Sequence, residues 1–268
     1  MRKVAHISDL HFGAHLPAVA EALRVDLHAF DPALVIASGD FTQRARSSQF
    51  EQARDFLSRL PRPQLVVPGN HDIPLYDFTR RFLSPLGRYR RYISSEDDPV
   101  FRDDELFVAG LNTARSLTWK NGRISHQQLK KLQQRLQDAG PRLKLVVTHH
   151  PFIPPPDGAG IALVGRASHA IPILASSGVD LLLAGHLHHG YVGDTRAHYP
   201  SSDRGIIAVQ AGTAISRRVR HEPNAYNQLT LQLDSVEIET RVYRDGAFTR
   251  LSVLIFKRIE QLWVRSEQ

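Results

Sequence analysis

The sequence predicts a layered α/β fold, and three observations support this prediction. Short runs rich in Val, Ile and Leu recur along the first two thirds of the chain, as in buried strands. Helical patterns separate several of these runs, and the last quarter has strand patterns alone. A chain of 268 residues can bury one large core, so we expect a single domain over residues 1–268.

Buried strands are expected at six apolar runs, and amphipathic helices at four segments between or after them. The runs are residues 4–7, 33–37, 64–67, 106–109, 143–147 and 179–183. Apolar residues at three- and four-residue spacing, typical of one face of a helix, occupy residues 17–30, 47–60, 125–139 and 165–177.

Beyond Gly205 the helical patterns end, and strands are expected at residues 206–210, 225–233, 236–244 and 247–256. Asp245-Gly246 is typical of a tight hairpin turn between the last two strands. We expect these strands to form a second, antiparallel sheet that packs against the first. Residues 247–268 are then a C-terminal strand and tail, which we expect to end in a short helix.

Composition limits the classes of function. Thirty-four Lys and Arg against 27 Asp and Glu give a formal net charge of +7, which suits an anionic substrate and equally an ordinary basic surface. The absence of Cys excludes thiolate metal sites and disulfides. The N-terminus reaches Ser8 and Asp9 before an apolar signal core could form, and no run approaches the ~20 apolar residues of a membrane span. We therefore expect a cytoplasmic protein.

Polar motifs rich in His and Asp follow five of the predicted strands directly. They are Asp9-Leu10-His11, Ser38-Gly39-Asp40, Pro68-Gly69-Asn70-His71-Asp72, Thr148-His149-His150 and Gly185-His186-Leu187-His188-His189. Ligands of open α/β sheets bind at the carboxyl ends of the strands, so these motifs can converge on one cleft. Each motif alone is common in structural or surface positions, but their joint occurrence favours a metal site. Gly39, Gly69 and Gly185 are expected where a Cβ atom would crowd the ligands.

The order D-x-H, G-D, G-N-H-D, H and G-H-x-H resembles that of the calcineurin-like metallophosphoesterase superfamily over residues 4–212. The sequences of these motifs are most similar to those of the bacterial class III cyclic-nucleotide and glycerophosphodiester phosphodiesterases. The resemblance implies a sandwich of two mixed β-sheets flanked by helices, with a metal site at the C-terminal strand ends. It also implies a hydrolase of a small anionic phosphodiester, with 3′,5′-cyclic nucleotides as one candidate.

The resemblance further implies a ligand set for two divalent cations. One cation would be held by Asp9, His11 and His188, the other by Asn70, His149 and His186, and Asp40 would bridge them. His71 would stay uncoordinated beside the phosphate as a proton donor, with Asp72 orienting its ring, and His150 would lie on the substrate side. Donors without sulfur suit Mn²⁺, Fe²⁺/Fe³⁺ or Zn²⁺, which would lower the pKa of a shared water and provide hydroxide near neutral pH.

Basic residues after the third motif are candidates for substrate binding, and residues 74–100 form a candidate cap. Residues 79–92 contain Arg80, Arg81, Arg88, Arg90 and Arg91 interleaved with aromatic residues and no acid. The pattern fits a cap that pairs guanidinium groups with phosphate, and it fits equally an ordinary basic helix face. A second candidate rim comprises Arg217, Arg218, Arg220 and His221.

Other functions stay open on the sequence alone. A nucleotide-sugar or lipid pyrophosphate hydrolase would use the same centre, and so would a nuclease, although a nuclease needs a longer basic track and nucleic acid is not an expected partner. A non-catalytic scaffold is a further alternative. Residues 251–265 either complete the sheet or form an interfacial segment on anionic lipid. The sequence does not indicate an oligomeric state.

Overall fold

The computed structural model describes residues 1–118, 120–156, 158, 160–200, 202, 204–219 and 222–266, which form two β-sheets covered by helices. The first sheet has seven strands in the order β13 (Leu262–Arg265), β12 (Ala247–Ile259), β11 (Ser235–Arg244), β10 (Ala225–Leu231), β1 (Arg2–Ile7), β2 (Leu34–Ala37) and β3 (Gln64–Val66). The second has six, in the order β4 (Val100–Arg102), β5 (Leu106–Gly110), β6 (Leu143–Val147), β7 (Leu181–Ala184), β9 (Ile207–Gln210) and β8 (Tyr191–Asp194).

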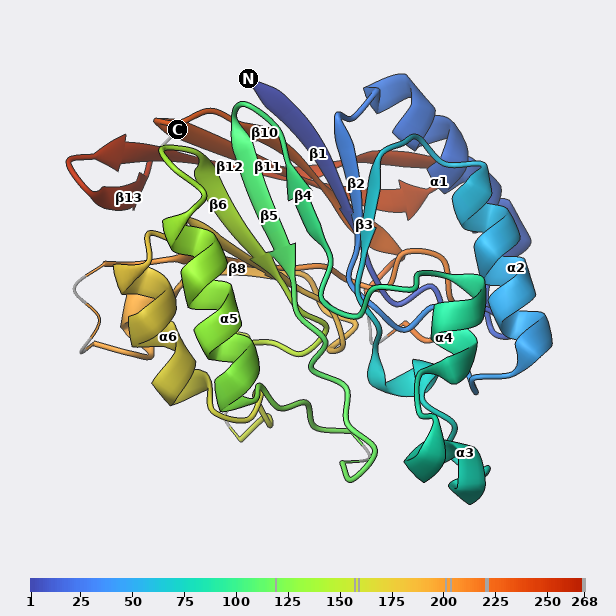
Figure 1. Cartoon of the computed structure of the whole chain (residues 1–268). Coiled ribbons are helices and arrows are strands. Elements are labelled where there is room, and N and C mark those ends of the chain that lie inside the picture. The colour runs from blue at the N-terminus through green and yellow to red at the C-terminus, as the bar shows by residue number, and fades with distance from the viewer. Residues whose placement is uncertain are drawn as a thin grey trace.

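Both sheets are mixed, which confirms the predicted fold class. Strands β1, β2 and β3 are parallel, and so are β5, β6, β7 and β9, whereas the other pairs are antiparallel. Helices α1 (Pro17–Phe30) and α2 (Ser47–Ser58) cover the first sheet, and α5 (His126–Gln137) and α6 (Ala167–Ser176) cover the second (Figure 1). The short helices α3 (Phe78–Leu83) and α4 (Gly87–Tyr92) follow the third motif.

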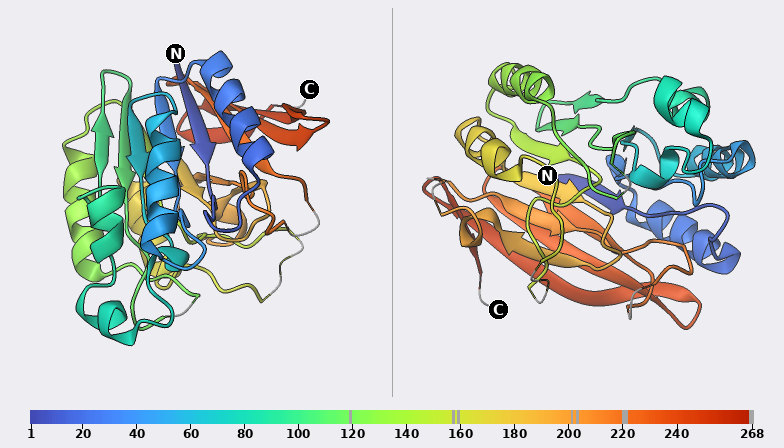
Figure 2. Two further views of the ribbon diagram at one scale, coloured as in Figure 1. Left: turned by 90° about the vertical axis from the view of Figure 1, so that its right-hand side faces the viewer. Right: turned by 90° about the horizontal axis from the view of Figure 1, so that it is seen from below.

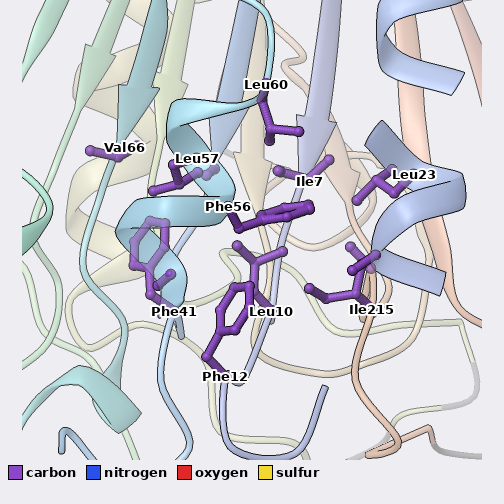
Figure 3. Packing of buried hydrophobic residues seen from close by; sticks show 14 of the residues in the cluster. Ile7, Leu10, Phe12, Leu23, Phe41, Phe56, Leu57, Leu60, Val66 and Ile215 are labelled. Carbon is purple, nitrogen blue, oxygen red and sulfur yellow. The ribbon is translucent and has the colours of Figure 1, made fainter. Parts of the chain in front are cut away.

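Three clusters of buried apolar side chains separate the four layers. One lies between the sheets and includes Ile36 of β2 and Leu145 of β6. A second lies under α1 and α2, where Leu23 and Phe56 meet Ile7 of β1 (Figure 3). The third joins α5 and α6 to the second sheet. Apolar side chains on both faces of the central strands explain why these strands appear in the sequence as continuous apolar runs.

The expectation of a separate antiparallel sheet after Gly205 is wrong. Strand β10 pairs antiparallel with β1, so β10 to β13 extend the first sheet, whereas β9 joins the second sheet parallel to β7 (Figure 2). Apolar alternation marks a strand but does not specify its neighbour, and β1 would otherwise be an unpaired edge.

The expected C-terminal helix is also absent from the described residues, because β12 continues to Ile259 and turns back as β13. Trp263 of β13 and Phe256 of β12 are buried between the two sheets. This burial favours an extended hairpin, which places alternate side chains on the inner face, over an interfacial helix. The end of the predicted tail, residues 267–268, lies outside the described residues.

The five motifs follow strands of both sheets, and their loops are joined across the boundary between the sheets. Between the sheets, His186 N–H donates to Asp9 Oδ2 at 2.8 Å, and within the second sheet Gly185 N–H donates to the His149 carbonyl at 3.0 Å. In addition, His149 Nδ1 is 2.7 Å from the carbonyl oxygen of Ser38. The layered arrangement therefore places the carboxyl ends of β1, β2, β3, β6 and β7 around one centre.

Candidate metal centre

The backbone at the centre adopts a conformation that L-residues rarely take. Positive φ angles are found at Asp9 (54°), His11 (46°), Asp40 (53°), His186 (76°) and His188 (57°), which are half of the ten such non-glycine residues in the described chain. This left-handed region is uncommon outside glycine, and strain of this kind concentrates at functional sites. The strand ends are therefore shaped to direct these five side chains inward.

The glycines of three motifs lie against predicted ligand residues. A Cβ atom on Gly69 would lie 2.1 Å from Asp40 Oδ1, and one on Gly39 would lie 2.6 Å from His149 Nδ1. On Gly185 it would lie 2.6 Å from Asp9 Oδ2. These distances are far below van der Waals contact, which confirms the prediction that a side chain at these positions would crowd the ligands.

Four buried side chains form a first group of donor atoms. His11 Nε2 and His188 Nε2 are 3.1 Å apart, and Asp9 Oδ1 lies 3.5 Å from the former and 3.2 Å from the latter. Asp40 Oδ2 is 3.6 Å from His11 Nε2. Donor atoms of a tetrahedral cation with bonds of about 2.0–2.1 Å lie about 3.3–3.4 Å from one another. The spacing of this group therefore fits one cation.

A second group adjoins the first. His149 Nε2 is 3.2 Å from Asn70 Oδ1 and 3.3 Å from His186 Nδ1. It also lies 3.4 Å from Asp40 Oδ2, the same oxygen that approaches His11. One carboxylate oxygen thus belongs to both groups, as expected of a bridging ligand.

The buried atoms of the centre fit bound cations. Asp9 Oδ1 is buried without a hydrogen-bond partner, and the ion contacts of Asp9 and Asp40 among the described residues are to imidazoles alone. An uncompensated buried carboxylate is costly, and a cation offsets that cost. Two imidazoles are also oriented for coordination, because His149 Nδ1 and His188 Nδ1 face carbonyl oxygens of Ser38 and Arg218. Their Nε2 atoms therefore stay free for a metal.

Proton affinities in the centre reflect crowding of charge in a buried space. Burial alone would raise the pKa of Asp9, but His188, His11 and His149 hold that pKa well below its usual value. Burial would lower the pKa of His149, yet Asp40 and Asp9 raise it to about 9. Burial and the nearby Asp40 raise the pKa of Asp72 to about 7, against the effect of its hydrogen bonds. Positive charge is therefore favoured beside the carboxylates.

His71 lies beside the ligand groups without belonging to either. Its ring is 4.9 Å from that of His11, but Nδ1 is 2.9 Å from the carbonyl oxygen of Gln43. Because a carbonyl only accepts, Nδ1 carries the proton in this contact and Nε2 faces outward. Arg218 Nη1 donates to this Nε2 at 2.9 Å. The arrangement fits the predicted uncoordinated position beside a substrate.

Asp72 does not orient the His71 ring, contrary to the expectation from the sequence. Its carboxylate accepts hydrogen bonds from the backbone N–H groups of Phe41, Thr42 and Gly69 and from the Thr42 hydroxyl. These groups surround the carboxylate and leave it no contact with the ring, so Gln43 provides the orienting contact. Asp72 instead ties the third motif to the second.

His150 lies near the second group, but both of its ring nitrogens are engaged. Nδ1 is 2.7 Å from the Thr113 hydroxyl, and Nε2 is 3.0 Å from the carbonyl oxygen of Lys120. Although its nitrogens come close to those of His149 and His186, a ring held on both sides is poorly placed to bind a metal. His150 thus holds Thr113 and Lys120 next to the centre.

A cavity of about 230 Å³ opens beside the centre. It is lined by Gln43, Arg44, Asn70, His71, Ile73, Leu75, Lys120 and Arg218. Among the described residues, no carboxylate oxygen lies within 4.0 Å of the charged groups of Arg44, Lys120 or Arg218. Three cations without acidic partners at one cavity favour an anionic ligand.

Of the predicted substrate residues that the structure describes, only Arg218 lines this cavity. Arg81 is buried and donates to three backbone carbonyls, Arg80 pairs with Asp77, and Arg90 pairs with Asp97. Arg91 lies over the ring of Tyr92, and Arg217 N–H donates to the carbonyl of Ala14. Arg220 and His221 lie outside the described residues.

Sequence reasoning missed Gln43, Arg44 and Lys120. Gln43 and Arg44 come three and four residues after Asp40, so a search along the loop beyond the second motif would have found them. Lys120 lies far from every motif in the sequence, so no search near the motifs would have found it. Its carbonyl contacts His150 of the fourth motif, and this tertiary contact places Lys120 at the cavity.

The fold and the donor atoms together define an α/β sandwich protein with a candidate two-cation centre at its strand ends. The family model described as calcineurin-like phosphoesterase matches residues 2–190. The chain therefore belongs to the calcineurin-like phosphoesterase family.

Curated relatives and a solved structure resemble the chain. It is 28% identical over 180 residues to 3′,5′-cyclic adenosine monophosphate phosphodiesterase CpdA of Escherichia coli, a match that covers 64% of this chain and 59% of that protein. It is 27% identical over 164 residues to glycerophosphodiester phosphodiesterase GpdQ of Enterobacter lignolyticus, covering 56% and 57%. The chain thus spans less than two thirds of the length of these relatives.

The solved structure of a dimetal phosphatase from Danio rerio superposes with a TM-score of 0.66 at 17% identity, over 95% of this chain and 98% of that chain. At this identity the likeness establishes the shared fold. No helix of the described residues has the length and apolar content needed to cross a membrane.

Proposed function

We propose that the chain is a phosphodiesterase with two divalent cations at the strand-end centre. The approach of Asp40 Oδ2 to both His11 and His149, at 3.6 and 3.4 Å, is the observation that carries this proposal. Asp9, His11 and His188 would hold one cation and Asn70, His149 and His186 the other. The nitrogen and oxygen donors suit Mn²⁺, Fe or Zn²⁺. Two such cations stabilise charge on a phosphate and lower the pKa of a shared water.

The chain's own residues would position the phosphate and its leaving group. Arg218 donates to His71 Nε2 and lines the cavity, so its guanidinium can transfer its hydrogen bonds to an entering phosphate oxygen. His71 would then face the leaving oxygen with a ring fixed by Gln43. Because Nδ1 already carries a proton, His71 would donate from Nε2 as the imidazolium, after Nε2 has left Arg218 and taken up a proton from solvent.

A small phosphodiester is the proposed substrate class. The relatives named above are described as a cyclic-nucleotide and a glycerophosphodiester phosphodiesterase. A cavity of about 230 Å³ is smaller than the ~300 Å³ lower limit typical of pockets that enclose a whole drug-sized ligand. It therefore fits one half of a small diester. Because three cations surround it, a pyrophosphate of a nucleotide sugar or lipid is the second candidate.

The test is hydrolysis by protein reconstituted with Mn²⁺ or Zn²⁺. The substrates are cyclic AMP, a glycerophosphodiester, a nucleotide-sugar pyrophosphate and single-stranded DNA. We expect hydrolysis of at least one small diester and its loss on chelation. Hydrolysis of the pyrophosphate alone would support the second candidate. A protein that binds two cations and hydrolyses none of the four would contradict the proposal and favour a scaffold.

A further inference from the structure

Five large apolar side chains are exposed on two segments that adjoin lining residues of the cavity in the sequence, residues 76–83 after Leu75 and Leu117 before Lys120. We call them the mouth patch: Tyr76, Phe78, Phe82, Leu83 and Leu117 have exposed fractions of 71%, 59%, 54%, 82% and 84%. Single exposed apolar residues are ordinary on protein surfaces, but a group of them at one place marks an interaction site.

Hydrogen bonds hold the two segments of the mouth patch together. Arg81 of α3 donates to the carbonyls of Ser116 and Thr118 at 2.8 and 3.0 Å, on either side of Leu117. Arg44 of the cavity donates to the Tyr76 hydroxyl at 2.7 Å. Figure 1 shows α3 projecting beyond the carboxyl ends of the strands, at the end of the molecule that holds the cavity.

The net charge of the chain is concentrated in the same two segments. Residues 74–92 and 111–123 contain eight basic residues, Arg80, Arg81, Arg88, Arg90, Arg91, Arg115, Lys120 and Arg123, and one acid, Asp77. Removing these from the 34 basic and 27 acidic residues leaves 26 of each, so the rest of the chain is formally neutral. Of these residues Arg80 and Arg90 pair with Asp77 and Asp97, and Arg81 is buried. The exposed basic residues of the two segments that have no carboxylate partner among the described residues are Arg91, Lys120 and Arg123.

The combination identifies the chemistry of the partner. Basic groups mixed with exposed apolar side chains match a surface that presents negative headgroups over a hydrocarbon layer. Single-stranded nucleic acid also binds basic surfaces with aromatic rings, but it uses rings for stacking. The two most exposed members of the mouth patch, Leu83 and Leu117, are aliphatic and have no ring to stack, which favours lipid.

We infer that the mouth patch docks the protein on an anionic lipid surface, with the cavity facing the headgroups. The inserted side chains would be those of α3 and the loop around Leu117. The phosphates would be met by the cavity cations Arg44, Lys120 and Arg218, which have no carboxylate partner among the described residues. This surface differs from the C-terminal segment considered from the sequence, because Phe256 and Trp263 are buried between the sheets. The docking does not depend on the proposed reaction.

Vesicle flotation without substrate tests the inference. Wild-type protein is expected to float with vesicles containing phosphatidylglycerol, and to bind pure phosphatidylcholine vesicles on the order of tenfold less tightly. Binding should weaken at about 0.5 M NaCl, where surface charges are screened. Leu83→Asp with Leu117→Asp should lower affinity on the order of tenfold or more, since two apolar contacts are lost and negative charge is added.

Leu251→Asp is the matched control, because Leu251 is 51% exposed on β12, outside the mouth patch, and this variant should bind like wild type. Thermal unfolding of both variants verifies their folds. Equal binding to both kinds of vesicle, or undiminished binding by the double variant, would overturn the inference. So would a wild-type dimer that the double variant dissociates, because the patch would then cover a second copy. Binding of single-stranded DNA, without binding of either kind of vesicle, would assign the mouth patch to nucleic acid instead.

Discussion

His71 shows how a residue beside the two candidate ligand groups is kept apart from them. Gln43 and Arg218 occupy its two ring nitrogens, so the ring faces the cavity rather than the donor atoms. If His71 protonates the leaving group, His71→Ala should bind two cations normally but lose on the order of 10²–10⁴-fold in kcat on an alkyl or ribose ester.

Bis-nitrophenyl phosphate should suffer much less from His71→Ala, because nitrophenolate leaves without a proton. Comparing kcat for the two substrates therefore checks the role. Equal losses on both would exclude proton donation, and loss of a metal ion from the variant would exclude the uncoordinated position.

His6 gives a prediction for stability against pH. It is fully buried beside Ser38, and burial lowers its pKa from 6.5 to about 3. Below pH 6.5 the unfolded chain therefore binds a proton at this position that the folded chain does not. The contribution of the neutral ring to the free energy of unfolding should therefore fall by up to ~1.4 kcal/mol per pH unit as the pH drops from about 6.5 to 3.

Urea unfolding between about pH 4 and 6 checks this prediction with His6→Gln, whose pH slope should be shallower by about one proton. Gln52→Ala, at an exposed position of α2 that carries no titratable group, should keep the wild-type slope. Identical slopes for His6→Gln and wild type would show that His6 is not held neutral by folding.

Asp72 illustrates how one residue stabilises several strand-end elements. It accepts three backbone N–H groups and one hydroxyl from the second and third motifs. Asp72→Ala would leave those buried donors without a partner, so we expect a loss of roughly 3 kcal/mol or more in unfolding free energy. Metal affinity should fall as well, since Asp40 and Asn70 lie on the loops that Asp72 joins.

Chemical denaturation and metal titration of Asp72→Ala measure these two effects, with the exposed Glu51→Ala of α2 as a control. Unchanged stability would mean that the loops keep their geometry without the carboxylate.

Asp180 anchors the C-terminal hairpin to the second sheet. Its Oδ1 accepts from Arg258 Nη2 at 2.8 Å and Trp263 Nε1 at 3.2 Å, and also from Arg204. Asp180→Ala would remove the common partner of two partly buried guanidinium groups, at a cost of roughly 3 kcal/mol. Amide exchange in β13 should accelerate, whereas Asp234→Ala in the exposed turn should change little. Slow exchange in the variant would show that apolar packing alone holds the hairpin.

The elements themselves were predicted better than their partners. Apolar runs located β1, β2, β3, β5, β6 and β7, because burial on both faces leaves a continuous signal. The same signal could not place β9 and β10 in different sheets, since strand pairing depends on contacts distant in sequence. The prediction of a C-terminal helix was wrong, because Trp263 becomes buried as part of a β-hairpin.

For the molecule as a whole, the order of the motifs was enough to predict that five distant segments converge. Convergence follows from a general rule, that the carboxyl ends of parallel strands meet at one edge. The cavity could be predicted only in part, since Gln43 and Arg44 follow the second motif closely, whereas Lys120 comes from a loop that only tertiary contacts bring to the centre. The positions of the motif residues thus follow from the strand topology, whereas the lining of the cavity follows from tertiary packing.

The metal content of wild type and Asp40→Ala, measured by elemental analysis after equilibration with Mn²⁺ or Zn²⁺, tests the central claim most directly. Wild type should hold two ions per chain, and Asp40→Ala should lose metal from both groups, because its carboxylate approaches both His11 and His149. Asp97→Ala, which removes an acid paired with Arg90 outside the centre, should keep two ions. Two ions retained in Asp40→Ala, or one ion in wild type, would contradict a centre bridged by Asp40.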